Sequence, residues 1–161
     1  MITIGVLTIS DGASKGERQD ASGENIRAMV AQLPDAAISA NAIIPDETDQ
    51  ITAMLREWCD DKHLNLILTT GGTGLAPRDV TPEATKMVIE RDAPGIAEAL
   101  RAISLQYTRT AMLSRGVAGV CGRTLIINLP GSPKAVKECL EYVLPVLPHA
   151  INLVTEGPRE H

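Results

Sequence analysis

Short apolar runs alternate along this chain with segments whose apolar side chains recur at helical spacing. The first run covers residues 2–10, and Ile26, Met29, Val30 and Leu33 follow it on one predicted helix face. Continuous apolar runs are typical of strands buried on both faces, and the spacing after them indicates amphipathic helices. Strands and helices in alternation build a sheet covered on both sides. The predicted fold is therefore α/β, a three-layer α/β/α sandwich with a mainly parallel sheet.

The alternation continues through the chain without a linker or a repeat. Further strands are predicted at residues 38–44, 64–70, 117–120 and 124–128, with helices between and after them. Ser22, Thr81 and Ser132 are the predicted caps of three of these helices, because Ser and Thr oxygens accept hydrogen bonds from the first free backbone N–H groups. The whole chain, residues 1–161, is expected to form a single domain.

Composition excludes several classes of function. Apolar residues make up 44% of the 161 residues and aromatics only 2%, so aliphatic side chains must fill the core. No apolar run is long enough to cross a bilayer, and no charged segment precedes an apolar one at the N-terminus. A cytoplasmic protein without a membrane partner is expected. The net charge of -5 argues against nucleic acid as a partner.

The cysteines Cys59, Cys121 and Cys139 are odd in number and widely spaced. They show no spacing typical of a metal site, so reduced structural thiols are the prediction and a zinc site is not expected.

The most informative local feature is the loop in residues 67–82, where an apolar strand leads into three glycines within four positions and then Arg78-Asp79. Glycines let backbone N–H groups approach phosphate oxygens, and the helix that follows adds its positive end. The loop is neither a Walker A motif nor a G-x-G-x-x-G motif. A plain turn is the alternative for an isolated glycine cluster. The flanking Arg-Asp pair and the helix start favour an anion site with a carboxylate beside it.

Polar residues follow several other predicted strands. Asp11 follows the first strand, Asp46 the second and Gly131 to Lys134 the last. Ligands of parallel sheets lie outside the carboxyl ends of the strands, where these loops meet. The loops are therefore expected to share one site.

Five motifs in order resemble the Mog/MoaB family, the molybdopterin adenylyltransferases of molybdenum cofactor synthesis. They include Thr69-Thr70-Gly71-Gly72-Thr73-Gly74 with the downstream Arg78-Asp79-Val80-Thr81-Pro82, and also Ile9-Ser10-Asp11, Ile44-Pro45-Asp46-Glu47, Leu113-Ser114-Arg115-Gly116 and Asn128-Leu129-Pro130-Gly131-Ser132-Pro133-Lys134. The resemblance covers residues 3–151 and implies one antiparallel strand in the sheet and a homotrimer.

The resemblance implies ATP and molybdopterin as substrates, with transfer of AMP to the terminal phosphate of molybdopterin. It also implies hand-off of the product to a molybdate-insertion protein. Two polyanions must meet on an acidic protein, so Mg²⁺ and a few placed cations are the electrostatic requirement. Asp46 and Asp79 match acidic positions of the family motifs and are the predicted catalytic and metal-binding residues. The predicted substrate-binding residues are Ser10, Asp11, Thr70, Gly71, Gly72, Thr73, Gly74, Arg78, Ser114, Gly131, Ser132 and Lys134.

Several of these residues also have a purely structural interpretation. Asp46 could cap the helix that contains Ile51, and Asp79 could pair with Arg78 or accept hydrogen bonds from loop amides. Asp11 could hold a turn, and Ser114 could satisfy backbone groups instead of substrate. Lys134 could be a solvated lysine in the first turn of its helix, where the helix dipole disfavours a cation.

Three functions fit the motifs. The first is the adenylyltransferase, which the complete glycine loop and Arg-Asp pair favour. The second is a non-catalytic module that binds molybdopterin or nucleotide. The third is a subunit similar to the molybdate-insertion proteins, whose additional domains would need more than 161 residues.

Overall fold

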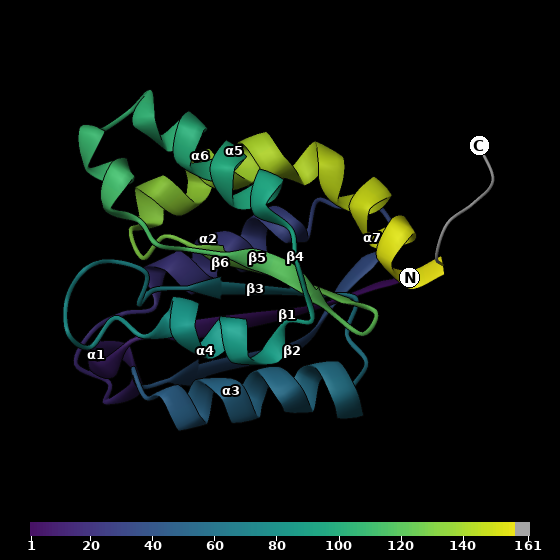
Figure 1. The fold of residues 1–161 in the computed structure, drawn as a ribbon, viewed down its shortest axis with the longest axis horizontal. Helices are drawn as coiled ribbons and strands as arrows, with labels where there is room; N and C mark the ends of the chain where they lie inside the picture. The colour runs from purple at the N-terminus through teal and green to yellow at the C-terminus, as the bar shows by residue number, and fades with distance from the viewer. Residues whose placement is uncertain (157–161) are drawn as a thin grey trace.

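The computed structural model describes residues 1–156 and shows a six-stranded sheet between two layers of helices (Figure 1). The strands are β1 (Ile2–Ile9), β2 (Ala36–Ile44), β3 (Leu66–Thr70), β4 (Arg91–Asp92), β5 (Ala118–Cys121) and β6 (Thr124–Leu129), in the spatial order β2-β1-β3-β6-β5-β4. β5 runs antiparallel to both of its neighbours, and β1, β2, β3 and β6 are parallel. The predicted sandwich and its antiparallel strand are confirmed.

The helices divide between the two faces of the sheet. Apolar residues of α2 (Ala21–Val30), α5 (Pro94–Leu105), α6 (Pro133–Val143) and α7 (Leu147–Glu156) pack into one core cluster, while α3 (Thr48–Arg56), the π-helical turn η1 (Glu57–Asp61) and α4 (Thr81–Val88) cover the other face. Short helical turns complete the chain: α1 (Asp11–Ser14), η2 (Arg109–Leu113) and η3 (Leu144–Val146). Within residues 1–156, no helix combines the length and the apolar character that crossing a membrane requires.

Alternation along the strands explains the two cores. On β1, Ile4 and Val6 belong to the cluster under α2 and α6, whereas Leu7 and Ile9 belong to the cluster under α3 and α4. All four are buried, which accounts for the continuous apolar run in the sequence. Trp58 lies in the second cluster, with its ring directly over Gly5, and so packs in the core.

The predicted helix caps are correct for one helix and wrong for two. Ser132 caps α6 by accepting a hydrogen bond from the N–H of Ala135. Ser22 does not cap α2, because Asp20 is the N-cap and its carboxylate accepts the hydrogen bond from the N–H of Gly23. Thr81 is the first residue of α4 rather than its cap, because Val80 occupies the N-cap position and none of the described side chains caps this helix.

Candidate active site

The loops that carry the sequence motifs meet at the carboxyl edge of the sheet, on the left in Figure 1. β2 and β3 lie on opposite sides of β1 in the sheet. The connection from β1 to β2 therefore runs to one side of β1, and the connection from β2 to β3 crosses to the other side. Such a change of direction opens a crevice beyond the strand ends, where ligands of α/β proteins bind. The fold therefore brings together loops that lie more than a hundred residues apart, as the hydrogen bond from the Ser22 hydroxyl to the Gly131 carbonyl shows.

A cavity of about 270 Å³ opens between the ends of β1 and β3. It is lined by the segment that leads into α2, by Asp46 and by the glycine loop. Seven of the residues predicted from the sequence line it: Ser10, Asp46, Thr70, Gly71, Gly72, Asp79 and Gly131.

A second cavity of about 460 Å³ lies on the other side of the glycine loop, against α5 and η2. Its predicted residues are Gly72, Thr73, Gly74, Asp79, Ser114, Gly131 and Ser132. Gly72, Asp79 and Gly131 line both cavities. The two cavities therefore adjoin at these three residues.

Glycine is required at two positions of the loop. Gly71 has φ 98° and Gly72 has φ 67°, which side-chain-bearing residues rarely adopt. A Cβ on Gly71 would meet the carbonyl oxygen of Ile9, and one on Gly72 would meet Thr81 Oγ1 and lie 3.0 Å from Asp46 Oδ1. The backbone of the loop thus passes closely between β1, Asp46 and the start of α4.

Asp46 and Asp11 join the loops after β2 and β1 by a reciprocal pair of hydrogen bonds. The N–H of Asp11 donates to Asp46 Oδ2 at 2.9 Å, and the N–H of Asp46 donates to Asp11 Oδ1 at 3.0 Å. Asp46 does not cap α3, whose N-cap is Glu47, so that alternative is wrong. Burial raises the pKa of Asp46, and the negative charges of Asp11 and Asp79 raise it further. The hydrogen bond from the Asp11 N–H lowers this pKa but does not cancel the rise. Asp46 is therefore a carboxylate whose negative charge is poorly compensated.

Asp79 is half-buried at the junction of the two cavities. Its Oδ2 accepts a hydrogen bond from the N–H of Ala76 at 3.0 Å, so it does satisfy one loop amide. It does not pair with Arg78. Among the described residues, no hydrogen bond reaches Oδ1 of Asp79 or Oδ1 of Asp46. Each carboxylate thus keeps one oxygen available beside the smaller cavity.

Carboxylate oxygens are the type of donor that a hard divalent cation takes. Mg²⁺ is usually held by one or two carboxylates and completes its coordination with substrate phosphates and water. The half-buried Asp46 carboxylate and the oxygens without a hydrogen bond match that pattern.

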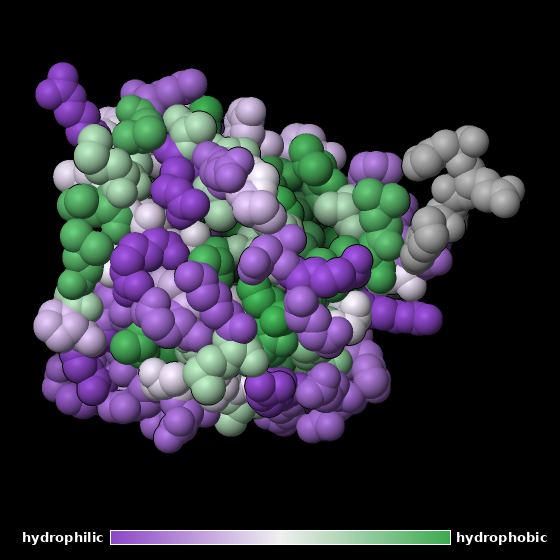
Figure 2. All heavy atoms as spheres, in the orientation of Figure 1, coloured by the Kyte–Doolittle hydropathy of each residue, from purple (hydrophilic) through white to green (hydrophobic). Residues whose placement is uncertain are grey.

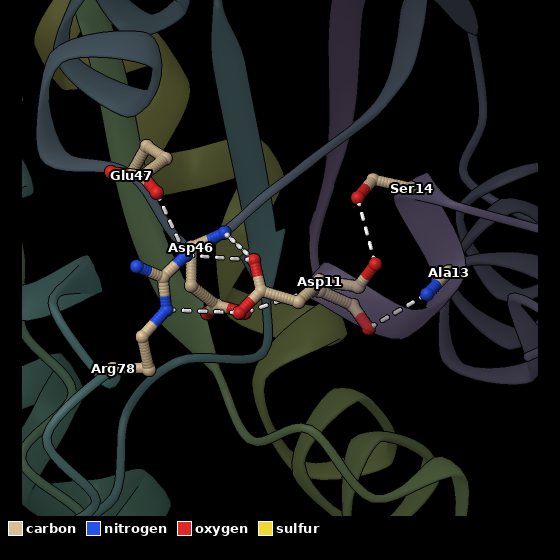
Figure 3. A network of polar contacts seen from close by, with 7 residues as sticks. Asp11, Ala13, Ser14, Asp46, Glu47 and Arg78 are labelled. Atoms are coloured by element: carbon tan, nitrogen blue, oxygen red, sulfur yellow. Dashed lines mark hydrogen bonds and ion pairs between the residues drawn. The ribbon is translucent and has the colours of Figure 1, made fainter. Parts of the chain in front are cut away.

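Arg78 and Asp11 form an ion-pair cluster that is joined to Asp46 through the hydrogen bonds between Asp11 and Asp46 (Figure 3). Arg78 donates to both carboxylate oxygens of Asp11 at 3.0 Å and to Glu47 Oε1 at 2.8 Å. The Arg78 guanidinium, followed by the N–H of Asp46, lowers the pKa of Asp11. Asp11 and Arg78 do not line either cavity, and neither does Lys134, which is exposed at the start of α6. These three predicted substrate-binding residues therefore lie beside the site and not at its surface.

A cation that does line the smaller cavity is Arg18. It is exposed, and its side chain makes no hydrogen bond or ion pair with any residue in the described part of the chain. Arg101 lines the larger cavity, with its guanidinium bonded to the Gly116 carbonyl at 2.8 Å. Arg18 is accordingly the guanidinium best placed to receive an anion in the smaller cavity.

Hydroxyl groups hold the loop after β6 against the rest of the site. Thr70 Oγ1 donates to the Pro130 carbonyl and Ser22 Oγ donates to the Gly131 carbonyl, each at 2.6 Å. Other predicted hydroxyls are engaged locally. Ser10 Oγ accepts the N–H of Ala13 at the start of α1, and Ser114 Oγ accepts the N–H of Gly116 at 3.3 Å.

Arg115 has a role that the sequence did not reveal. Its Nε donates to the Gly74 carbonyl at 2.8 Å and its NH2 group to the Asp79 carbonyl at 2.7 Å. Its backbone N–H donates to the Thr73 carbonyl, and its NH1 group pairs with Glu83 at 2.6 Å. One side chain thus holds both ends of the segment from Gly74 to Asp79. The only signal in the sequence was the place of this arginine in a motif shared with the family.

The fold and this edge define the class of the protein: an α/β sandwich with a glycine loop and two carboxylates at the switch point of its sheet. A family model described as "probable molybdopterin binding domain" matches residues 5–149. The chain belongs to this molybdopterin-binding family, and the family resemblance of the motifs is confirmed.

Named relatives agree with this assignment. The molybdopterin adenylyltransferase of Helicobacter pylori (strain J99) is 47% identical over 95% of this chain and 88% of its own length. The crystal structure of the molybdopterin biosynthesis enzyme MoaB from Thermus thermophilus has a TM-score of 0.92 and 54% identity over 99% of this chain and 100% of that chain. The Drosophila molybdenum cofactor synthesis protein cinnamon is 47% identical over 95% of this chain, which spans only 26% of that longer protein.

Proposed function

We propose that this protein is a molybdopterin adenylyltransferase that transfers AMP from ATP to the terminal phosphate of molybdopterin and releases pyrophosphate. The observation that carries the proposal is the pair of adjoining cavities with Gly72, Asp79 and Gly131 in common. Two substrates bound on either side of the glycine loop would bring their phosphates together at these residues. The name of the Helicobacter pylori relative supports the same activity.

The reaction asks for positioning rather than for a general base. An oxygen of the molybdopterin phosphate attacks the α-phosphorus of ATP, a new P–O–P linkage forms, and the bond to the β-phosphate oxygen breaks with its electron pair on pyrophosphate. A phosphate monoester has a second pKa near ~6, so its attacking oxygen is largely ionised at neutral pH. The work of the protein is to align the two phosphates and to compensate their charge.

The residues of the site can meet this demand. Gly71, Gly72 and Arg18 line the smaller cavity, where backbone N–H groups of the glycine loop would bind phosphate oxygens and Arg18 would add a positive charge. Asp46 and Asp79 would hold Mg²⁺, which supplies charge neutralisation for the leaving pyrophosphate. Arg115 keeps the Asp79 segment in place.

The proposal extends to assembly and location. A shallow apolar cavity of about 410 Å³ lies between α5 and the end of α6, and Tyr142 and Val146 beside it are each 55% exposed. Figure 2 shows hydrophobic side chains interspersed with polar ones over this layer of helices. Exposed apolar surface of this kind is typical of an interface, which supports the homotrimer. Light scattering should give three times the protomer mass, and a monomer would remove this part.

The proposal has two further parts, the cellular location and a partner that receives the product. The three free, buried cysteines fit a reducing compartment such as the cytoplasm. Hand-off to a molybdate-insertion protein fits the longer relative cinnamon, in which a matching segment is joined to further residues.

The test is pyrophosphate release from ATP by the purified protein with intact molybdopterin. Release should require all three of ATP, molybdopterin and Mg²⁺, and chelation should stop it while pterin binding persists, since binding alone creates no leaving group. If saturating substrates and Mg²⁺ give no adenylylated product although both substrates bind, the non-catalytic binding module replaces this proposal.

A further inference from the structure

A cluster of side chains of the metal-ligating type, two thiols and a carboxylate, lies at the opposite, amino edge of the sheet. Cys59 belongs to the π-helical turn η1, and Cys121 ends β5 at the hairpin on the right in Figure 1. The two residues are 62 positions apart, yet the Cys59 thiol donates to the Cys121 carbonyl oxygen at 2.9 Å. Both side chains are buried, with 4% exposure each. The spacing of the cysteines in the sequence concealed this proximity.

A carboxylate completes the cluster. The two sulfur atoms and one carboxylate oxygen of Asp60 all lie within 4.8 Å of one another. Two sulfurs bound to one tetrahedral zinc ion are roughly 3.8 Å apart, given Zn–S bonds of about 2.3 Å. Small side-chain movements would therefore bring all three atoms onto one ion. Asp60 is exposed, which leaves the cluster open to solvent on one side.

The charge around the cluster favours a cation. Glu90 Oε1 lies 3.9 Å from Cys121 Sγ and accepts the N–H of Gly122 at 3.1 Å. The carboxylates of Asp60 and Glu90 beside the two thiols would stabilise the positive charge of a bound metal ion.

We propose that Cys59, Cys121 and Asp60 form a binding site for a thiophilic divalent cation of the zinc type, distinct from the carboxyl-edge site. Two thiols each release a proton when the ion binds, and a water molecule or Glu90 fills the fourth position. Sulfur ligands select zinc-like ions over Mg²⁺, so the two sites differ in chemistry as well as in place. The bound ion links η1 to the β5–β6 hairpin and so stabilises the amino edge.

The experiment titrates the reduced, metal-free protein with Co²⁺, whose thiolate complexes absorb by sulfur-to-metal charge transfer. One equivalent should produce this band, Zn²⁺ should abolish it by displacement, and the midpoint of thermal unfolding should rise with Zn²⁺. Cys59→Ser and Cys121→Ser should each weaken binding by more than the 10–100-fold typical of losing an outer-sphere partner. Asp60→Asn, at an exposed position, should weaken it by about tenfold or more.

Cys139→Ser is the matched control, because Cys139 is also a buried thiol but lies on α6, with its sulfur 3.2 Å from Ser104 Oγ. Its Co²⁺ spectrum and affinity should equal those of the wild type. Circular dichroism of each variant without metal separates loss of a ligand from loss of the fold, and Asp60→Asn keeps the test valid if a buried cysteine variant does not fold. Undiminished binding in Asp60→Asn together with either cysteine variant would overturn the proposal. The proposal would also be overturned if the reduced wild type bound neither Co²⁺ nor Zn²⁺ while oxidation joined Cys59 and Cys121 in a disulfide.

Discussion

Two carboxylate clusters lie next to each other at the carboxyl edge of the sheet, and they differ in how their charge is compensated. Asp11 is bonded through both oxygens to Arg78, which also pairs with Glu47 at the surface. Asp46 and Asp79 are half-buried and each keep one oxygen without a hydrogen bond among the described residues. The first cluster ties the loops together, and the second holds the two oxygens to which the proposed cation would bind. Loss of the first should therefore affect stability, and loss of the second should affect activity.

The largest expected effect is that of Asp79→Asn. The substitution removes the charge at the junction of both cavities, and kcat should fall by about 10²–10³-fold, as for loss of one transition-state contact. Stability should change by no more than about 1 kcal/mol, because the amide oxygen can still accept the N–H of Ala76. Pyrophosphate release and thermal unfolding measure the two effects. Asp49→Asn, at an exposed acid outside both cavities, is the control, and a folded Asp79→Asn protein as fast as this control would refute the role of Asp79.

Arg115→Gln tests whether the position of Asp79 depends on the hydrogen bonds of Arg115. Without the bonds to the Gly74 and Asp79 carbonyls, the loop should shift, and displacements near 1 Å can cost about 10²-fold in rate. Glu83→Gln breaks only the exposed ion pair of Arg115 and should change the rate little. Equal losses in the two variants would mean that the ion pair, and not the loop contacts, explains the effect.

Gly72→Val should weaken binding of both substrates by at least about tenfold. A residue with a side chain at φ 67° costs roughly 1–2 kcal/mol, and the new Cβ would meet Thr81 and Asp46, so the loop should move out of the position in which it binds phosphate. Equilibrium binding of ATP and of molybdopterin measures the loss. Gly95→Ala, where a Cβ meets nothing within 4 Å, should bind both as the wild type does. Unchanged affinities in Gly72→Val would show that the loop is only a turn.

The smallest effects concern stability and pH, and they have opposite signs in the two clusters. The folded-state pKa of Asp11 is lowered below 3.8, so its stabilising contribution is present above the unfolded pKa and is lost as pH falls through the folded value. Asp11→Asn should thus be less stable than the wild type at neutral pH and lose this difference in acid.

The pKa of Asp46 is raised above 3.8, so its contribution is present below the unfolded pKa and is lost as pH rises through the folded value. Asp46→Asn without metal should therefore be at least as stable as the wild type at neutral pH. Urea unfolding at neutral and acid pH checks both variants. A destabilised Asp46→Asn protein at neutral pH would make the second cluster structural as well.

The layers and the meeting of the motif loops at one edge of the sheet were predictable because they depend on burial and chain order. The apolar run of β1 and the helical spacing of Ile26, Met29 and Val30 reflect which faces are buried, and parallel strands bring their loops to one edge. Partner choice was not predictable in the same way. Arg78 pairs with Asp11 and Glu47 because the loops after β1 and β2 meet beside it, and no local pattern records that meeting.

Competition between neighbours explains the other differences. Asp20 takes the cap that was assigned to Ser22, whose hydroxyl then holds the Gly131 carbonyl across the site. The contacts of Arg115 could not be predicted either, because its partner Gly74 lies 41 positions earlier in the chain.

The central claim is that the Asp46 and Asp79 pair makes this edge a centre for adenylyl transfer. The most direct measurement is a single turnover with molybdopterin and ATP labelled at the α-phosphorus, carried out on the wild type and on the Asp46→Asn, Asp79→Asn double variant. We expect the wild type to move the label to molybdopterin in the presence of Mg²⁺ and the folded double variant to leave it in ATP. Transfer of the label by the double variant at the wild-type rate would contradict the claim.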